Sequence, residues 1–355
     1  STYPTPGLNY VKPEPYGVVA LILTWNAPVF GSMMKVIPAL AAGNSVVIKS
    51  AEFCAFGVML FVELLEQAGF PKGVINLVSG GPEAGAALVS HTGIDKISFT
   101  GGIQTARKIG VSAAQNVVPT LMELGGKSAN MVFNDADLAK AIPFAVYTSI
   151  VALSGQGCVN PTRMLVQDEI YDTVVEQLKA VIDAVPVGDP LDLNVQMGPV
   201  MTAQACDRIM GVIERARREN VGRIVAGGAR GTGDLAAGNF IRPTLIVDVP
   251  NDSFLAQEEI FGPVLVVVRF KTEAEAIAMA NDTAYGLGGY IWTQDISRAM
   301  RLADQVEAGS VHVNGFSGMG PTTPFGGFRQ SGYGKEGGRQ GVQEFLREKS
   351  VFIAY

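Results

Sequence analysis

Short apolar runs alternate with longer amphipathic segments along the first third of the chain. The β-branched and aliphatic run at 18–23 predicts a buried strand, and similar runs predict further strands at 45–48, 74–78 and 96–99. The segments between and after them predict helices at 29–42, 54–68, about 80–90 and about 100–109. Short apolar strands that alternate with helices predict a parallel sheet covered by helices on both faces.

The same alternation resumes after about residue 127. It predicts helices at 138–153, 169–183, 202–218, 273–280 and 296–306, and strands at 163–166, 222–226, 242–247, 265–269, 288–292 and 310–313. The first 15 residues predict an extended arm, and the tail predicts a helix to Arg347 followed by a strand at 350–355. A chain of 355 residues is long for a single core. We therefore expect an α/β protein of two domains.

Polar and glycine residues follow the predicted strands of the first half. Ligands of parallel sheets bind beyond the carboxyl ends of the strands, so these residues should converge on one crevice. They are Trp25-Asn26, Lys49, Glu52, Gly80-Gly81 and Thr100-Gly101. This crevice is the expected cofactor site.

Composition excludes several classes of function. The formal net charge is −6, and no basic run is present, so neither nucleic acid nor an anionic membrane surface is expected as a partner. No apolar run is predicted to span a bilayer. The three cysteines, Cys54, Cys158 and Cys206, form no C-x-x-C pair, which argues against a metal site or a disulfide framework. A reducing, cytoplasmic setting fits best.

Cys158 lies in the small-residue turn Ser154-Gly155-Gln156-Gly157-Cys158, between a helix-like apolar run and a strand-like run. A substrate could approach a thiol in such a turn closely, because no bulky neighbour shields it. A buried cysteine that acts as a small hydrophobic side chain is the alternative. This segment alone leaves both interpretations open.

Several motifs occur in an order that resembles the aldehyde dehydrogenase superfamily, and the resemblance extends from about Tyr16 to the end of the chain. They are Thr24-Trp25-Asn26-Ala27-Pro28, Lys49-Ser50-Ala51-Glu52, Phe99-Thr100-Gly101, Glu123-Leu124-Gly125-Gly126-Lys127, Gly155-Gln156-Gly157-Cys158, Glu259-Ile260-Phe261-Gly262-Pro263 and Pro324-Phe325-Gly326-Gly327. No single motif would be decisive, but their shared order makes coincidence very improbable.

The resemblance implies a catalytic set. Cys158 matches the nucleophile, which is effective as the thiolate. The Asn26 amide and the Cys158 backbone N–H match the oxyanion donors. Glu123 matches the base that activates water for thioester hydrolysis, and its apolar neighbours should raise its pKa. Lys35 and Glu336 match a pair associated with proton relay, although a solvated lysine and an ordinary tail charge are the alternative.

The resemblance also implies a nicotinamide cofactor. Lys49 and Glu52 match the pair that holds the adenosine ribose, and a carboxylate there favours NAD over NADP because it would repel a 2′-phosphate. Glu259 matches the carboxylate on the nicotinamide ribose, and Phe261 would pack beside that ring. The other predicted cofactor-binding residues are Thr24, Trp25, Gly81, Thr100, Gly101 and Leu124. No metal is expected.

The implied organisation is a Rossmann-like NAD-binding domain at 16–125, a catalytic domain at 126–338, and oligomerisation strands at 1–15 and 339–355. Family members associate through such strands, so a homodimer or homotetramer is expected. The first helices of the family have no counterpart here, which predicts either a fragment or a short form.

Some residues depart from the family pattern. Gly102 and Ala106 replace a small hydroxyl residue and a glycine near the pyrophosphate, and the Gly80–Gly81 loop is one residue shorter than is common. Ala27 and Met34 stand where aromatic residues often line the substrate tunnel. We therefore expect a roomy, apolar tunnel and an apolar aldehyde as substrate.

Three rival functions remain open at this stage. A cysteine hydrolase would need a histidine base, and His91 and His312 are both expected to be structural. A CoA-acylating aldehyde dehydrogenase would tend to lack the glutamate that Glu123 matches. A catalytically silent protein on the same fold is the third, because fold does not imply function.

Overall fold

The computed structural model describes residues 5–316, 318, 320 and 322–355. Its contacts divide the chain into two compact units. The first unit comprises Ser1–Leu124, Met319–Gly326 and Gly332–Tyr355, and the second comprises Gly125–Gly318 and Gly327–Ser331. Residues 319–326 and 332–338, which the sequence assigns to the catalytic domain, therefore belong to the first unit. The assignment of cofactor binding to 16–125 and of catalysis to 126–338 stays a prediction.

A six-stranded sheet in the order β14-β6-β5-β2-β3-β4 forms the centre of the first unit. All neighbouring strands are parallel except β14, which is antiparallel to β6. The strands are β2 (Val18–Ile22), β3 (Ser45–Lys49), β4 (Ile75–Val78), β5 (Lys96–Thr100), β6 (Thr120–Glu123) and β14 (Gly332–Tyr333). The chain adds β3 and β4 on one side of β2, and then β5 and β6 on the other. The carboxyl ends of β2 and β5 therefore flank a topological switch point.

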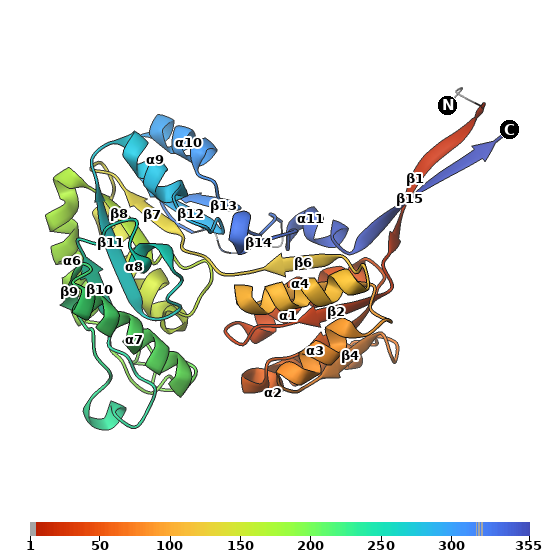
Figure 1. The fold of residues 1–355 in the computed structure, drawn as a ribbon, viewed down its shortest axis with the longest axis horizontal. Helices are drawn as coiled ribbons and strands as arrows, with labels where there is room; N and C mark the ends of the chain where they lie inside the picture. The colour runs from red at the N-terminus through yellow and green to blue at the C-terminus, as the bar shows by residue number, and fades with distance from the viewer. Residues whose placement is uncertain (1–4, 317, 319, 321) are drawn as a thin grey trace. The chain divides into compact units, whose positions relative to one another are not determined.

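Helices cover both faces of this sheet (Figure 1). On one face, α1 and α2 pack Val36 and Val58 against Val19 of β2. On the other face, α3 and α4 pack Val89 and Ile109 against the sheet. The helices are α1 (Pro28–Ala41), α2 (Ala55–Gln67), α3 (Pro82–Ser90), α4 (Ile103–Gln115) and α11 (Gly338–Gln343). Because both faces are buried, the strands are continuous apolar runs, which is why the sequence predicted them.

The strands β1 (Gly7–Pro15) and β15 (Leu346–Ala354) form an antiparallel ribbon that extends away from the sheet of the first unit (Figure 1). Its apolar side chains are largely exposed, among them Leu8, Tyr10, Phe352 and Ile353. An isolated pair of strands is at best marginally stable in water. The ribbon is therefore a candidate surface for association.

A seven-stranded sheet in the order β13-β12-β7-β8-β11-β10-β9 forms the second unit. Only β9 is antiparallel to its neighbour. The strands are β7 (Ala129–Val132), β8 (Arg163–Gln167), β9 (Arg223–Ala226), β10 (Thr244–Val247), β11 (Val264–Phe270), β12 (Gly288–Trp292) and β13 (Ser310–Val313). Since β8 lies on one side of β7 and the late strand β12 on the other, the switch point of this sheet lies between β7 and β12.

Helices also cover both faces of the second sheet. One face packs against α5 (Leu138–Val146) and α6 (Tyr171–Asp183), through residues such as Ile142 and Leu178. The other face packs against α7 (Ala203–Glu219), α8 (Phe254–Gln257), α9 (Glu273–Asn281) and α10 (Ile296–Gln305). The α/β architecture predicted from the sequence is therefore observed in both units.

The structure differs from the sequence prediction at several elements. The strands β6, β7 and β14 have four residues or fewer and adjoin glycine-rich or polar segments, so the apolar pattern does not reveal them. The helix α4 continues to Gln115 because one glycine inside a helix costs only about 1 kcal/mol. The predicted oligomerisation strand at 339–355 is wrong in its first part, since Gly338–Gln343 is helical and β15 begins at Leu346.

The predicted helix at 138–153 is divided into three pieces. The α-helix α5 contains Pro143 and is followed by a π-helical turn, Tyr147–Val151, and a 3₁₀ turn, Ala152–Gly155. By length and composition alone, Leu138–Gly155 could cross a membrane, with a mean hydropathy of 1.4 over 18 residues. The apolar pattern of the sequence had predicted no span there. Half of the stretch is buried within the protein, as in a core helix, so the evidence for a membrane span is weak.

Candidate active site

Cys158 follows a strained turn between α5 and β8. Leu153, Ser154 and Gly155 have φ values of 54°, 52° and 72°. This conformation costs a non-glycine residue about 1–2 kcal/mol, so surrounding contacts must maintain it. The buried Ser154 donates a hydrogen bond from Oγ to the carbonyl of Gly198 over 2.9 Å. Strain of this kind is concentrated at functional sites.

Cys158 itself is half-buried, just before the amino end of β8. The glycines around it leave no room for side chains. A Cβ at Gly155 would lie 2.2 Å from the carbonyl oxygen of Gly262, and one at Gly157 would lie 2.3 Å from Asn160 Oδ1. Among the described residues, none of the three cysteines forms a disulfide. The thiol is therefore partly accessible on a closely packed turn, as a nucleophile requires.

Glu259 lies at the same edge of the second sheet, before β11. Its Oε1 accepts the backbone N–H of Gly126 over 2.9 Å. Burial raises the pKa of Glu259, while the Gly126 N–H and the charges of Lys127 and Arg208 lower it. A Cβ at Gly126 would lie 2.6 Å from the carbonyl oxygen of Cys158. The second unit thus brings Glu259, Gly126 and Cys158 together.

Phe261 follows Glu259 by two residues and has a φ of 51°. A bulky residue with positive φ is uncommon and needs support from its surroundings. The side chain of Arg208 donates a long hydrogen bond, 3.4 Å, to the Phe261 carbonyl. The Glu259–Phe261 loop is therefore held in one conformation before β11.

Glu123 ends β6 in the first unit and is 3% exposed. Neither carboxylate oxygen has a hydrogen-bond partner among the described residues. Burial raises the pKa of Glu123 well above its ordinary value, and the charge of Glu336 adds to this, while Lys35 and Lys335 oppose it. A buried carboxylate with a raised pKa is a stronger base than an exposed one.

Lys35 and Glu336 form a buried ion pair. Lys35, in α1, also donates a hydrogen bond to Ser98 Oγ over 2.8 Å. The alternative of a solvated lysine and an ordinary tail charge is therefore wrong. Because the charge of each member influences Glu123, the structure brings these three predicted residues into one electrostatic cluster of the first unit.

The residues predicted to bind the cofactor lie at the carboxyl edge of the first sheet. Thr24 Oγ1 donates to Asn26 Oδ1 over 2.9 Å, just after β2. Lys49 ends β3, and its Nζ lies 3.6 Å from Glu52 Oε2. Lys49 is buried while the Glu52 side chain is 44% exposed, so the carboxylate can accept hydrogen bonds from a ligand. Trp25, next to Asn26, is half-buried.

The helices that begin at this edge have no side-chain caps. The N-cap residues of α1, α3 and α4 are Ala27, Gly81 and Gly102, and none provides a side-chain hydrogen bond. Uncapped helix N-termini present backbone N–H groups that suit an anion such as a pyrophosphate. Gly101, after Thr100, has no room for a side chain, because a Cβ there would lie 2.6 Å from the Phe99 ring. The predicted residue Leu124 is buried in the core of this unit. Together these features fit a dinucleotide.

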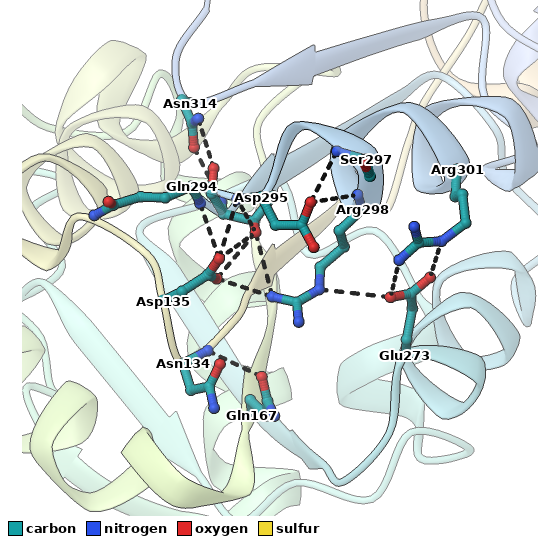
Figure 2. A network of polar contacts seen from close by, with 11 residues as sticks. Asn134, Asp135, Gln167, Glu273, Gln294, Asp295, Ser297, Arg298, Arg301 and Asn314 are labelled. Atoms are coloured by element: carbon teal, nitrogen blue, oxygen red, sulfur yellow. Dashed lines mark hydrogen bonds and ion pairs between the residues drawn. The ribbon is translucent and has the colours of Figure 1, made fainter.

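The carboxyl edge of the second sheet is closed by a polar network (Figure 2). Asp135, after β7, accepts hydrogen bonds from Thr293 Oγ1, the backbone N–H groups of Gln294 and Asp295, and Arg298 Nη1, over 2.8 to 3.1 Å. Arg298 also lies 3.5 Å from Glu273, which pairs with Arg301. The carboxylate is saturated by these donors, so this switch point is a structural feature and not a candidate site.

The two histidines fit structural roles. His91 Nδ1 accepts the Gly93 N–H over 3.0 Å, and His312 stacks on Tyr290, where burial lowers its pKa. No cluster of metal-ligating side chains occurs within the described part of the chain. Two further residues, Lys127 and Ser331, were not predicted from the sequence. Both are fully buried, and Ser331 Oγ donates to the carbonyl of Gly125, 206 residues earlier in the chain.

A model of the aldehyde dehydrogenase family matches residues 2–351. A betaine aldehyde dehydrogenase of Cereibacter sphaeroides is 41% identical over 344 residues, which cover 97% of this chain and 70% of that protein. A geranial dehydrogenase of Castellaniella defragrans is 41% identical over 350 residues, which cover 99% of this chain and 72% of that protein. The crystal structure of betaine aldehyde dehydrogenase from Staphylococcus aureus in complex with NAD+ is 37% identical, with a TM-score of 0.97, and covers 100% of this chain and 70% of that chain.

Proposed function

Because the chain belongs to the aldehyde dehydrogenase family, we propose that it oxidises an apolar aldehyde to the carboxylic acid through a thioester on Cys158. The predicted family, the α/β fold class and the assignment to NAD-dependent aldehyde dehydrogenases are confirmed. The roles of individual residues, the hydrolytic route and the preference for an apolar aldehyde are proposals. The strained, close-packed turn that presents Cys158 is the observation that carries the proposed nucleophile.

In the first step, the Cys158 thiolate adds to the aldehyde carbonyl carbon. The resulting oxyanion is stabilised by the Cys158 backbone N–H and the Asn26 side-chain amide. Thr24 supports this role, because it donates to Asn26 Oδ1 and so orients the amide. Loss of one such donor typically costs about 2.7–4 kcal/mol of transition-state stabilisation.

NAD, when bound, supplies the two-electron acceptor that converts the thiohemiacetal on Cys158 into a thioester. We propose that Lys49 and Glu52 hold its adenosine ribose and that Gly81, Thr100 and Gly101 lie along its phosphates. The exposed Glu52 carboxylate favours NAD over NADP, since it would repel a 2′-phosphate. We propose that Glu259 and Phe261 contact the nicotinamide riboside and that Thr24, Trp25 and Leu124 lie near it.

Glu123 then removes a proton from water, which attacks the thioester and releases the acid and the thiolate. Its burial supports this role, because a raised pKa makes a carboxylate a stronger base. Lys35 and Glu336 would carry the proton onward, since their buried pair influences Glu123. Glu123 also favours hydrolysis over the alternative of acyl transfer to CoA.

The apolar stripe of α1 supports an apolar substrate. Val29, Met33 and Ile37 are 43%, 50% and 43% exposed, and their spacing of four residues places them on one face of the helix that follows Asn26. This helix has no acidic residue to bind a cation. We therefore expect an aldehyde similar to that implied by the name geranial dehydrogenase, and not a charged one such as betaine aldehyde.

The exposed apolar ribbon of β1 and β15 supports the expected association into a homodimer or homotetramer. Light scattering coupled to size exclusion would measure the mass in solution. A monomer of the chain would contradict this expectation. A cytoplasmic location and the absence of nucleic-acid or membrane partners stay predictions.

The decisive test is NADH formation with a panel of aldehydes that includes geranial, betaine aldehyde and succinic semialdehyde. We expect turnover to be highest with geranial and to vanish in Cys158→Ala. Cys54→Ala, which changes another partly buried cysteine, is the matched control and should retain activity. Highest turnover with a charged aldehyde would contradict the apolar preference, and no turnover of any aldehyde by the folded protein would favour the catalytically silent alternative.

A further inference from the structure

The peptide unit between Gly125 and Gly126 is held by a side chain at each of its polar groups. Its carbonyl oxygen accepts a hydrogen bond from Ser331 Oγ over 2.7 Å, and its N–H donates to Glu259 Oε1 over 2.9 Å. Ser331 is fully buried, and its Oγ also accepts the Gly286 N–H over 3.0 Å. Buried peptide groups usually pair within helices or sheets. Here two side chains distant in sequence take over that role.

This peptide unit also has no space in which to move aside. A Cβ at Gly125 would lie 2.3 Å from Glu259 Oε2, and one at Gly126 would lie 2.6 Å from the Cys158 carbonyl oxygen. The next residue, Lys127, is fully buried, and its charge acts on Glu259. The glycines, Glu259 and the Cys158 backbone thus pack directly against one another within the second unit.

We propose that Glu259 and Ser331 are positioning residues that clamp the Gly125–Gly126 peptide unit and thereby fix the backbone that follows Glu123. The clamp rests on the proposed function, in which Glu123 hydrolyses the thioester on Cys158. Glu123 precedes Gly125 by two residues, so the clamp restrains the backbone that immediately follows the base.

Hydrogen exchange measured by mass spectrometry, in the protein without cofactor, tests the clamp directly. We expect the peptide covering 122–128 to exchange about tenfold faster in Glu259→Ala than in the unchanged protein, because a hydrogen bond to a charged acceptor is lost. Glu259→Gln keeps an acceptor oxygen and should retain slow exchange. Ser331→Ala should also accelerate exchange. Glu258→Ala, at a neighbouring exposed carboxylate, is the matched control and should have no effect.

A cofactor-free reaction tests the consequence for Glu123. With p-nitrophenyl acetate, the Cys158 thiolate would attack the ester carbonyl and expel nitrophenolate, and water would then hydrolyse the acetyl thioester, so no oxidant is needed. We expect Glu259→Ala to retain the initial nitrophenolate burst and to slow the later steady state about tenfold. Glu259→Gln, which keeps an acceptor for the Gly126 N–H, should slow the steady state less than Glu259→Ala does.

The two readouts separate the proposals. Unchanged exchange at 122–128 in both Glu259→Ala and Ser331→Ala, with native exchange elsewhere, would overturn the clamp. Equal acceleration in Glu259→Ala and Glu259→Gln would also overturn it, because charge and not the hydrogen bond would then be responsible. If exchange is faster in Glu259→Ala and Ser331→Ala but the unchanged protein gives no nitrophenolate burst, the clamp stands and the proposed role of Cys158 is refuted.

Discussion

The two edges of the second sheet are built in opposite ways. At the carboxyl edge, Asp135 is saturated by donors from the loop that follows β12 and by Arg298 (Figure 2). At the amino edge, the buried Lys127 Nζ and Ser128 Oγ have no hydrogen-bond partner among the described residues, and the turn before Cys158 is strained. Local rules are usually broken at functional sites and compensated elsewhere. The comparison places stability at one edge and candidate chemistry at the other.

The helices that follow the strands extend this comparison to the first sheet. In the second unit, Thr272 caps α9 and Asp295 caps α10 with their own side chains. In the first unit, the N-caps Gly81 and Gly102 of α3 and α4 do not. Both sheets have a switch point at the carboxyl edge. At the second, α10 is capped by Asp295 although α5 has no side-chain cap, whereas at the first neither α1 nor α4 has one. Topology alone therefore does not identify a cofactor site.

The largest expected effect is the loss of stability when Asp135, at the saturated carboxyl edge of the second sheet, is removed. Asp135→Ala should lower the free energy of unfolding by about 3 kcal/mol, because it leaves backbone donors and the Arg298 guanidinium without their acceptor. Urea denaturation would measure this loss, and the Kd for NAD should not change. Asp137→Ala, at a nearby exposed carboxylate, should change stability by less than about 0.5 kcal/mol. Equal losses in the two variants would break the comparison.

The unpartnered lysine at the amino edge should make stability depend on pH. Burial, and then the charge of Arg163, lower the pKa of Lys127 to about 7. Above that pH the unfolded chain binds a proton that the folded chain does not, so stability should rise with pH up to about 10, by at most about 1.4 kcal/mol per pH unit. Lys127→Met should remove this contribution. Urea denaturation between pH 7 and 9 would measure how the free energy of unfolding changes with pH. An equal change in Lys127→Met and in the unchanged protein would show that Lys127 has a partner.

A side-chain cap added to α4 in the first unit should make this helix resemble the capped helices α9 and α10 of the second unit. Gly102 has an extended backbone and open space for a side chain. Gly102→Asp should cap α4 and weaken NAD binding about tenfold, because the new carboxylate occupies the anion site and repels the pyrophosphate. Calorimetric titration would measure the Kd. Gly102→Asn provides a cap without a charge and should weaken NAD binding less. Equal Kd values for both variants and the unchanged protein would show that the pyrophosphate binds elsewhere.

The smallest effect should come from relief of strain before Cys158. Leu153 is 53% exposed and has a φ of 54°. Leu153→Gly should raise the free energy of unfolding by about 0.5–1 kcal/mol, since glycine adopts this conformation without steric cost, and should lower turnover by loosening the turn. Leu153→Ala, which keeps the strain, is the control. A gain in stability with unchanged turnover would show that the strain has no role in presenting Cys158.

The sequence by itself determined the elements that depend on neighbours along the chain. Continuous apolar runs predicted β2, β3, β4 and β5, and glycines and prolines marked the helix boundaries at their ends. The order of the motifs predicted the family and, through it, the candidate roles of Cys158, Glu123 and Asn26. The strands β6 and β7 were missed because they include polar residues and adjoin the glycine-rich segment between them, so no continuous apolar run marks them.

Only the tertiary structure decided the environments of the charged groups. The pair of Lys35 and Glu336 joins residues 301 positions apart, and the clamp on Gly125–Gly126 joins residues 206 and 133 positions apart. No local pattern distinguishes these side chains from solvated ones, because burial and pairing are set by which strands and loops the fold brings together. For the same physical reason, only the folded chain reveals the saturated carboxylate of Asp135 and the buried amine of Lys127, which has no hydrogen-bond partner among the described residues.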